Sequence, residues 1–423
     1  MPGMDELGRR GFLSAGLATA VGLTACSPSA PERTDTRFDP EDWDDVRALF
    51  PLDRALIHTA AFVFAAHPKP VRDAIERHRR GLDHDTHRYL DDHYAAESEA
   101  QAAAAAYLGG TPEQVALTDS TTMGLGLLYS GLHVRPDQDA VTSTHDFIAH
   151  HRALDLMSRR TGAPVRHVAL YDDPRAATEA DIVARLRAAI APTTRVVGVT
   201  WVHSSTGVRL PVPAIAAMLA ELNAGRAPQD RALLCVDGVH GFGAVDLAVA
   251  DLGCDFLTTG THKWLFGPRG TGLLWARSWD ALDPVIPSFA GTDEPGGAQL
   301  TPGGYHSVEH RWAVREAFDL HRRIGRHRIA ERIAVQATRL KKGLATIPSV
   351  RLVTPDDPEL SAGIVCCEID GLDAFTATRR LRAAGVVASV TPYQQQYLRF
   401  GPGIVTSPAQ MDEVVAAVRG LRP

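Results

Sequence analysis

The sequence predicts an α/β fold, with a large domain built on a mostly parallel sheet and a smaller α+β domain at the C-terminal end. Three observations lead to this prediction. The chain has 423 residues, 45% of them hydrophobic, which is enough for more than one simple domain. Its middle third alternates strand-like and helix-like segments, as parallel sheets require. A long amphipathic segment then leads into a mixed C-terminal unit.

Residues 1–26 are typical of an export signal rather than of a folded element. Arg9 and Arg10 precede a weakly hydrophobic stretch rich in Gly and Ala, which resembles a twin-arginine signal. The segment ends in Leu-Thr-Ala-Cys, which resembles a lipobox whose cysteine is acylated after cleavage. The sequence therefore predicts export to the periplasm or cell envelope, with Cys26 as the candidate lipid anchor and residues 27–38 as a tether.

Residues 39–308 are predicted to form an N-terminal arm and the large domain. Apolar residues recur at three- and four-residue intervals in its helical segments, whereas continuous apolar runs predict buried strands. The predicted helices are 179–190 and 212–223, and the predicted strands are 195–203, 232–237 and 271–276.

Residues 309–423 are predicted to form a connecting helix and the small domain. One amphipathic pattern runs from residue 309 to about 347, which predicts a single long helix. Strands are expected at 364–368 and 386–391, and a closing helix at 408–419.

Charge and cysteine content exclude several classes of function. The formal net charge is −6, so no basic excess favours a nucleic-acid partner. No Cys/His tract has the spacing of a zinc site, and no metal is expected. Cys235, Cys254, Cys366 and Cys367 lie in apolar segments, where a thiol behaves as a small hydrophobe, so no disulfide framework is predicted.

Residues 258–270, TTGTHKWLFGPRG, carry the most informative motif. Lys263 precedes a Gly-Pro loop and an apolar strand, which places its amine on a rigid turn. Burial among apolar groups lowers the pKa of a lysine, and the free amine is the form that makes a Schiff base. Alone, the motif could also belong to an ordinary lysine near a turn.

Asp237, upstream of Lys263, points to one cofactor. It ends a buried strand, and ligands of open α/β sheets bind at such ends. A carboxylate there can hold the ring nitrogen of pyridoxal 5′-phosphate (PLP) protonated, which makes the ring a better electron sink. Lys263 and Asp237 together therefore predict a PLP enzyme, and an aspartate that only caps a turn is the alternative.

A candidate phosphate site precedes both residues in the chain. Residues 117–128, LTDSTTMGLGLL, predict a strand that ends in a helix with hydroxyls in its first turn. Amides and hydroxyls at a helix N-terminus bind phosphate, so Ser120, Thr121 and Thr122 are the candidates. An ordinary helix cap is the alternative.

These motifs resemble the class V aminotransferase family of fold type I PLP enzymes, and within it the isopenicillin N epimerase-like branch. The resemblance spans nearly the whole chain after the signal. It implies a seven-stranded sheet, PLP on Lys263, and a homodimer in which residues 304–307 approach the neighbour's phosphate. The segments that carry it are THDF (144–147), WVHSSTGVRLPV (201–212), THKW (261–264), GYHSVEHRW (304–312) and SAGIV (361–365).

The resemblance also implies contacts to the phosphate and the ring. His240 and either Thr261 or His262 match positions that touch the phosphate or the ring substituents. Phe147 or His145 would lie over the ring, with Phe147 preferred because kynureninase-like relatives use phenylalanine there.

Two further positions concern the ring hydroxyl and the substrate. Ser204 falls where the family often has an asparagine that contacts the ring hydroxyl or the substrate, and is therefore a departure. Arg399 matches the arginine that binds the α-carboxylate of an amino-acid-like substrate through two parallel hydrogen bonds.

One absence narrows the reaction. Cysteine desulfurases of this family carry a catalytic cysteine shortly before the carboxylate arginine, whereas residues 388–397, ASVTPYQQQY, contain none. The resemblance implies epimerase or racemase chemistry at the Cα of an amino acid or small peptide, with an aminotransferase or C–S lyase as alternatives. A non-catalytic exported binding lipoprotein is the alternative of another class, and the presence of both Lys263 and Asp237 argues against it.

Overall fold

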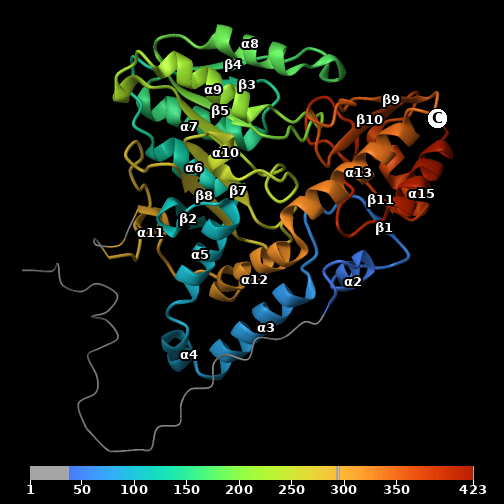
Figure 1. The fold of residues 1–423 in the computed structure, drawn as a ribbon, viewed down its shortest axis with the longest axis horizontal. Coiled ribbons are helices and arrows are strands. Elements are labelled where there is room, and N and C mark those ends of the chain that lie inside the picture. The colour runs from blue at the N-terminus through green and yellow to red at the C-terminus, as the bar shows by residue number, and fades with distance from the viewer. Residues whose placement is uncertain (1–37, 292–293, 295, 423) are drawn as a thin grey trace, which may run out of the picture.

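The computed structural model describes residues 38–291, 294 and 296–422. Arg9, Arg10 and Cys26, on which the export prediction depends, lie outside the described residues. Figure 1 shows the small domain, in red, beside the large domain, in cyan to yellow. The orange helices α12 (Val308–Ile324) and α13 (Arg326–Leu344) connect the two.

The large domain contains the predicted mostly parallel sheet of seven strands. β8 runs antiparallel to both of its neighbours, whereas the remaining pairs are parallel. In spatial order the strands are β2 (Val115–Thr118), β8 (Gly272–Ala276), β7 (Phe256–Gly260), β6 (Leu233–Asp237), β5 (Thr194–Thr200), β3 (Asp139–Ser143) and β4 (Val165–Val168). The prediction that 271–276 continues the parallel rhythm is wrong, because a turn without a helix joins β7 to β8 and reverses the chain.

Both faces of this sheet are buried, which explains the continuous apolar runs in its strands. Side chains alternate between the faces of a strand. In β6, Leu234 and Val236 enter one core, and Leu233 and Cys235 enter the other. The described cysteines are buried with free thiols.

Helices cover the two faces. α6 (Thr121–Gly131) and α7 (Ile148–Thr161) pack on one face. Helices on the other face include α5 (Ala96–Leu108), α8 (Glu179–Ala189), α9 (Val212–Asn223), α10 (Val249–Leu252) and α12, whose buried side chains join one core. The remaining helices of the large domain and the arm are α2 (Trp43–Ala48), α3 (Lys69–His84), α4 (Thr86–Asp92) and α11 (Gly296–Leu300).

The predicted single connecting helix is in fact two helices. α12 ends at Ile324, and α13 begins at Arg326 after Gly325, whose φ of +95° is incompatible with a continuing helix. The apolar pattern runs through the break and hides it from sequence analysis. α12 packs against α3 and α5, whereas α13 packs against α15 and the small sheet.

The small domain combines an antiparallel sheet with two helices and a parallel strand pair. The predicted strand 386–391 is split, because β11 pairs with β1 and β12 pairs with β13. β1 thus joins the start of the described chain to the small domain. The elements are β9 (Val350–Leu352), β10 (Val365–Ile369), β12 (Ser389–Val390) and β13 (Leu398–Phe400) in the sheet, β1 (Ile57–His58) with β11 (Val386–Val387), and helices α14 (Ala374–Ala383) and α15 (Pro408–Arg419).

Candidate active site

Parallel strands bring the candidate residues to one edge of the large sheet. β2, β3, β5, β6 and β7 run in the same direction, so their carboxyl ends share that edge. Asp237 is the last residue of β6, and the loops after the other four strands carry Ser120, His145, Ser204 and Lys263. The edge is where ligands bind in open α/β sheets.

The turn that carries Lys263 is rigid. The Phe266 amide donates to the Lys263 carbonyl at 3.1 Å, and the Gly267 amide donates to the Thr261 carbonyl at 2.8 Å. Phe266 is buried and has a φ of +58°, a conformation that costs a non-glycine residue free energy. Such strain persists only where the surroundings fix it, so the lysine has a defined position.

Lys263 and Asp237 lie at the ends of the neighbouring strands β7 and β6. Burial lowers the pKa of the Lys263 ammonium; the Asp237 carboxylate opposes this shift and Arg399 adds to it. Burial raises the pKa of the Asp237 carboxyl. The Val239 amide donates to Asp237 Oδ1 at 3.0 Å and fixes its direction. The site therefore contains a reactive amine and a carboxylate that ionises best beside a cation.

His240 lies beside the amine. Its Nε2 is 3.3 Å from Lys263 Nζ, and its Nδ1 accepts a hydrogen bond from Trp264 Nε1 at 3.4 Å. Burial and the charge of Lys263 hold the pKa of His240 well below its usual range, so the ring is neutral. His240 therefore lies in the part of the site next to the Lys263 amine, where its predicted contact with the phosphate or a ring substituent would be made.

A second part of the site forms where the N-terminus of α6 meets the end of β7. A β-carbon added to Gly260 would lie 3.1 Å from Thr121 Oγ1 and 3.1 Å from His262 Nδ1, so both atoms face one point. Both are buried and have no hydrogen-bond partner among the described residues. Buried polar atoms rarely stay unpaired, and a helix N-terminus attracts anions. These residues therefore fit the phosphate of the expected cofactor.

The other predicted phosphate ligands have different surroundings. Ser120 caps α6, because its Oγ accepts a hydrogen bond from a first-turn amide at 3.1 Å. Thr122 is exposed. The hydroxyl of Thr261 bonds across the lysine turn and stabilises it. The geometry favours Thr121 and His262.

His145 and Phe147, the candidates for the cofactor ring face, each contact a tyrosine. His145 stacks on Tyr171, with centroids 3.8 Å and planes 6° apart, whereas Phe147 meets Tyr393 edge to face at 6.0 Å. Burial lowers the pKa of His145 to about 3, so its ring is neutral. Its Nε2 is buried without a hydrogen-bond partner in the described part of the chain. Both residues remain candidates.

A buried polar network supports this region, and sequence analysis missed it. His203 Nε2 lies 3.4 Å from Asp146, and His203 Nδ1 lies 2.8 Å from the Tyr171 hydroxyl. Burial opposes ionisation of Asp146, but hydrogen bonds from His203 and Thr200 outweigh it and lower the pKa of the carboxyl. Asp146 and His203 lie in the motifs at residues 144–147 and 201–207, but the sequence does not show that these two motifs contact each other in the fold.

Arg399 on β13 is a buried cation from the small domain. Its guanidinium donates to Ser389 Oγ and to the Ser204 carbonyl, both at 3.1 Å, and lies 4.8 Å from the centroid of the Phe62 ring. Burial lowers its pKa. No carboxylate in the described ranges forms an ion pair with it, although a buried charge ordinarily needs one. It can therefore bind an anionic group of a ligand.

Tyr393 closes the site from the small domain. Its hydroxyl lies 2.8 Å from Ser204 Oγ. The serine that stands where the family often has an asparagine therefore has a tyrosine as its hydrogen-bond partner. Burial raises the pKa of Tyr393. The sequence did not single out Tyr393, because its partner Ser204 comes from the other domain.

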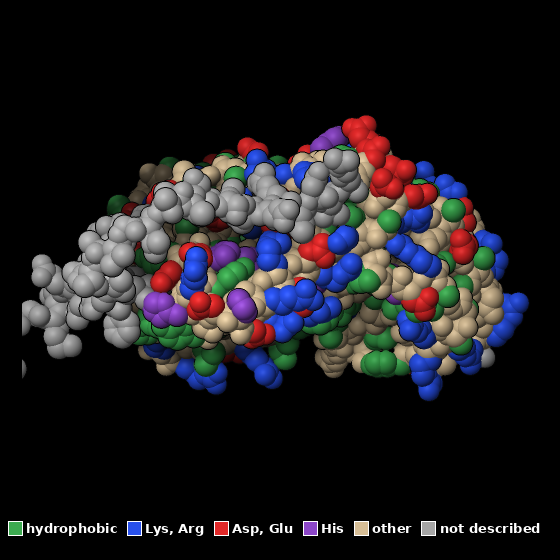
Figure 2. Space-filling model, turned by 90° about the horizontal axis from the view of Figure 1, so that it is seen from below, with side chains coloured by type: hydrophobic (Ala, Val, Ile, Leu, Met, Phe, Trp, Pro, Cys, Tyr) green, Lys and Arg blue, Asp and Glu red, His purple; other side chains and the backbone are tan. Residues whose placement is uncertain are grey.

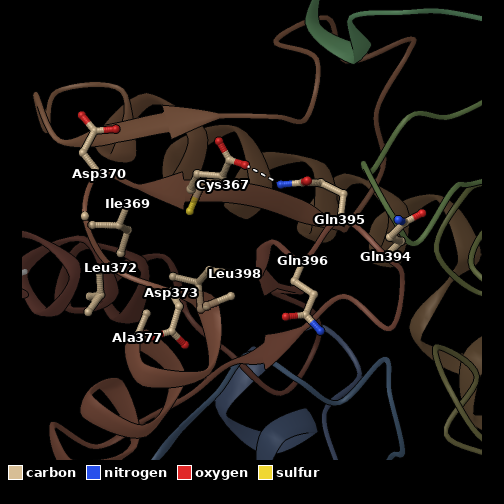
Figure 3. Close-up of a pocket in the computed structure, with 13 residues that line it drawn as sticks. Cys367, Ile369, Asp370, Leu372, Asp373, Ala377, Gln394, Gln395, Gln396 and Leu398 are labelled. Atoms are coloured by element: carbon tan, nitrogen blue, oxygen red, sulfur yellow. Dashed lines mark hydrogen bonds between the residues drawn. The ribbon is translucent and has the colours of Figure 1, made fainter.

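A cavity of about 450 Å³ opens on the small domain beside the same loop (Figure 3). Its lining contains none of the candidate residues. Gln395 points toward Glu368 there and donates to it at 2.9 Å. The cavity is lined by β10, the start of α14 and residues 394–396, which directly follow Tyr393.

Figure 2 shows basic and acidic side chains intermixed on the face seen from below, without the continuous basic field that nucleic acid prefers. Within the described ranges, no group of three or more His, Cys, Asp or Glu side chains is placed to hold a metal ion.

Comparison with known families gives one match that covers most of the chain. The model of the family "Aminotransferase class-V" matches residues 65–390. Among curated proteins, isopenicillin N epimerase of Streptomyces clavuligerus is 27% identical over 403 residues, which are 90% of this chain and 98% of that protein. A cysteine desulfurase of Klebsiella pneumoniae subsp. pneumoniae is 28% identical over 274 residues, 62% of this chain and 64% of that protein.

Solved structures share the fold. A C-DES mutant with glycine covalently linked to its PLP cofactor has a TM-score of 0.81 and 18% identity, covering 89% of this chain and 99% of that one. The apo cysteine desulfurase from Thermococcus onnurineus NA1 has a TM-score of 0.74 and 19% identity, covering 88% and 98%.

Proposed function

Because this chain belongs to the aminotransferase class-V family, we propose that it is a PLP-dependent enzyme that acts at the Cα of an amino acid or small peptide, with epimerase-like chemistry. The observation that carries the proposal is the pair formed by Lys263 and Asp237 at neighbouring strand ends. The full-length likeness to isopenicillin N epimerase supports the choice of reaction.

Each part of the site has a role in this proposal. Thr121 and His262 hold the cofactor phosphate, since their free polar atoms face one point. Asp237 holds a proton at the ring nitrogen. When bound, PLP withdraws electrons from the α-carbon of an amino acid and makes its Cα–H acidic. Lys263 removes and returns a proton at that carbon, and Arg399 binds the α-carboxylate and orients the Cα–H bond.

The lack of a cysteine at residues 388–397 disfavours sulfur transfer through a persulfide. The described cysteines are buried, and burial raises the pKa of the Cys366 thiol to about 12, so it is unreactive. Aminotransferase and C–S lyase reactions use the same site and are separated by their products.

The central test is to locate the cofactor and follow the Cα proton. We expect the purified protein to show an absorption band of bound PLP, and borohydride reduction to fix the cofactor to Lys263 in peptide mapping. In deuterated water, amino acids that change this band are expected to exchange their Cα–H and to appear as both stereoisomers. A keto acid product would indicate transamination or elimination instead. An adduct on any other lysine would refute the assignment of the site.

We further propose that the protein is exported in its folded state and acts as a homodimer, with residues 304–307 near the partner's phosphate. Tyr305 in this segment is 89% exposed, which suits a residue that another subunit covers. No described helix meets the length and hydropathy of a membrane span.

Export is tested at the paired arginines. Replacing Arg9 and Arg10 with lysine is expected to retain the protein in the cytoplasm, because a twin-arginine signal needs the guanidinium pair. Cell fractionation measures the distribution, and mass spectrometry of the exported form is expected to find a lipid on Cys26. Unchanged export of the double variant would contradict the proposal.

A further inference from the structure

Trp264, the residue directly after Lys263, is linked to the lysine amine by hydrogen bonds through His240. Its indole Nε1 donates to His240 Nδ1 at 3.4 Å, and His240 Nε2 lies 3.3 Å from Lys263 Nζ. The three side chains therefore form a hydrogen-bonded chain that ends at the amine.

The chemistry of these groups fixes the direction of the chain. An indole N–H can only donate, so His240 Nδ1 must accept. A neutral imidazole has one N–H, which is then on Nε2 and is directed at Lys263. Nζ can accept this hydrogen only through a lone pair, which the amine has and the ammonium lacks.

We infer that Trp264 is a positioning residue: it holds His240 in the tautomer whose Nε2–H donates to Lys263, so that the lysine is kept as the free amine. The inference rests on the proposed role of Lys263 as the attachment point. It adds a residue that need not contact the cofactor or the substrate.

Packing holds the indole in this orientation. Trp264 stacks on Phe62, with centroids 5.7 Å and planes 17° apart. A β-carbon on Gly363 would lie 2.4 Å from Trp264 Cη2, so only glycine leaves room for the ring at that position. Both neighbours come from other parts of the chain, and the indole cannot rotate without displacing them.

The charged groups near His240 and Lys263 affect which of the two side chains carries a proton. Lys263, His262 and Arg399 all disfavour an imidazolium at His240, in addition to burial. At Lys263 itself, Arg399 favours the amine and Asp237 favours the ammonium. The hydrogen bond from His240 stabilises the neutral form and therefore lowers the pKa of Lys263.

The test measures the amine in the cofactor-free protein. Formaldehyde and cyanoborohydride methylate Lys263 across a pH series, and mass spectrometry of its peptide gives the midpoint. In Trp264→Phe, His240 is free to place its proton on Nδ1 and accept from the ammonium. The midpoint is expected to rise by about one pH unit, so that labelling below it slows roughly tenfold. Trp275→Phe, which shortens another buried tryptophan, is the matched control and is expected to leave the midpoint unchanged.

A double-variant cycle separates the tautomer from packing. A phenylalanine at position 240 keeps a ring but has no nitrogen to donate or accept, so in His240→Phe the Trp264→Phe change is expected to shift the midpoint no further. Benzothienylalanine at position 264, which replaces the N–H with sulfur at nearly the same shape, gives the same test if the phenylalanine variant does not fold. An unchanged midpoint in both single variants at position 264, or an equal shift in the His240→Phe background, overturns the inference. Neither result alters the borohydride mapping, which tests the proposed function separately.

Discussion

Asp237→Ala is expected to retain PLP and to lose nearly all turnover. The Lys263 turn does not depend on the Asp237 side chain, so covalent attachment should survive. Without the carboxylate, nothing holds the proton at the ring nitrogen, and the electron withdrawal on which catalysis depends is weakened. By analogy with the loss of another preorganised charge-stabilising group, Cα–H exchange is expected to fall by about a hundredfold to a thousandfold.

Asp237→Asn is the control for structure. The amide oxygen can still accept from the Val239 amide, so the turn after β6 is preserved. The charge is lost, and exchange is expected to fall about as far as in the alanine variant. Cofactor content is read from the absorption band, and exchange from deuterium incorporation. Near-normal exchange in Asp237→Asn would show that the charge of this residue is not needed.

Arg399→Ala is expected to reduce kcat/KM for amino acids by about a hundredfold to a thousandfold, the usual loss when one partner of a buried charge pair is removed. Arg399→Lys should retain part of the activity, because an ammonium keeps the charge but not the paired hydrogen bonds. Steady-state kinetics with any turned-over amino acid measures both effects.

A matched substrate separates carboxylate binding from a structural role of Arg399. The amide of the same amino acid lacks the carboxylate charge, so the wild type should prefer the acid. Arg399→Ala should lose most of this preference. If Arg399→Ala lowers kcat/KM equally for acid and amide, the guanidinium mainly supports its neighbours, Ser389 and Ser204.

Local signals account for the parts of the structure that could be predicted. The closing helix was predicted at its observed ends, because Ser407 and Gln410 form a capping box before a clear apolar period. Lys263 and Asp237 were found because Lys263 precedes a Gly-Pro loop and an apolar strand, and Asp237 ends another apolar strand. The parallel sheet followed from the alternation of strands and helices.

The remaining parts depend on contacts that no local pattern encodes. The reversal of β8 is set by residues 261–271, which join β7 to β8 without a helix. The break at Gly325 leaves the apolar period intact. Tyr393 and Ser204 meet across the two domains, and Trp264 reaches His240 from the next strand end, so their pairing appears only in three dimensions.

The pairing of β1 with β11 joins a segment near the start of the described chain to one near its end. The Thr59 hydroxyl and the Val387 carbonyl, joined by a hydrogen bond, are 328 residues apart in sequence. At roughly 5–20 residues per second, a ribosome needs on the order of half a minute to make that stretch. Phe62, which packs against Trp264 and Arg399, follows β1 directly. A nascent chain therefore emerges with its first strand unpaired, and the site is first assembled only when synthesis is nearly finished.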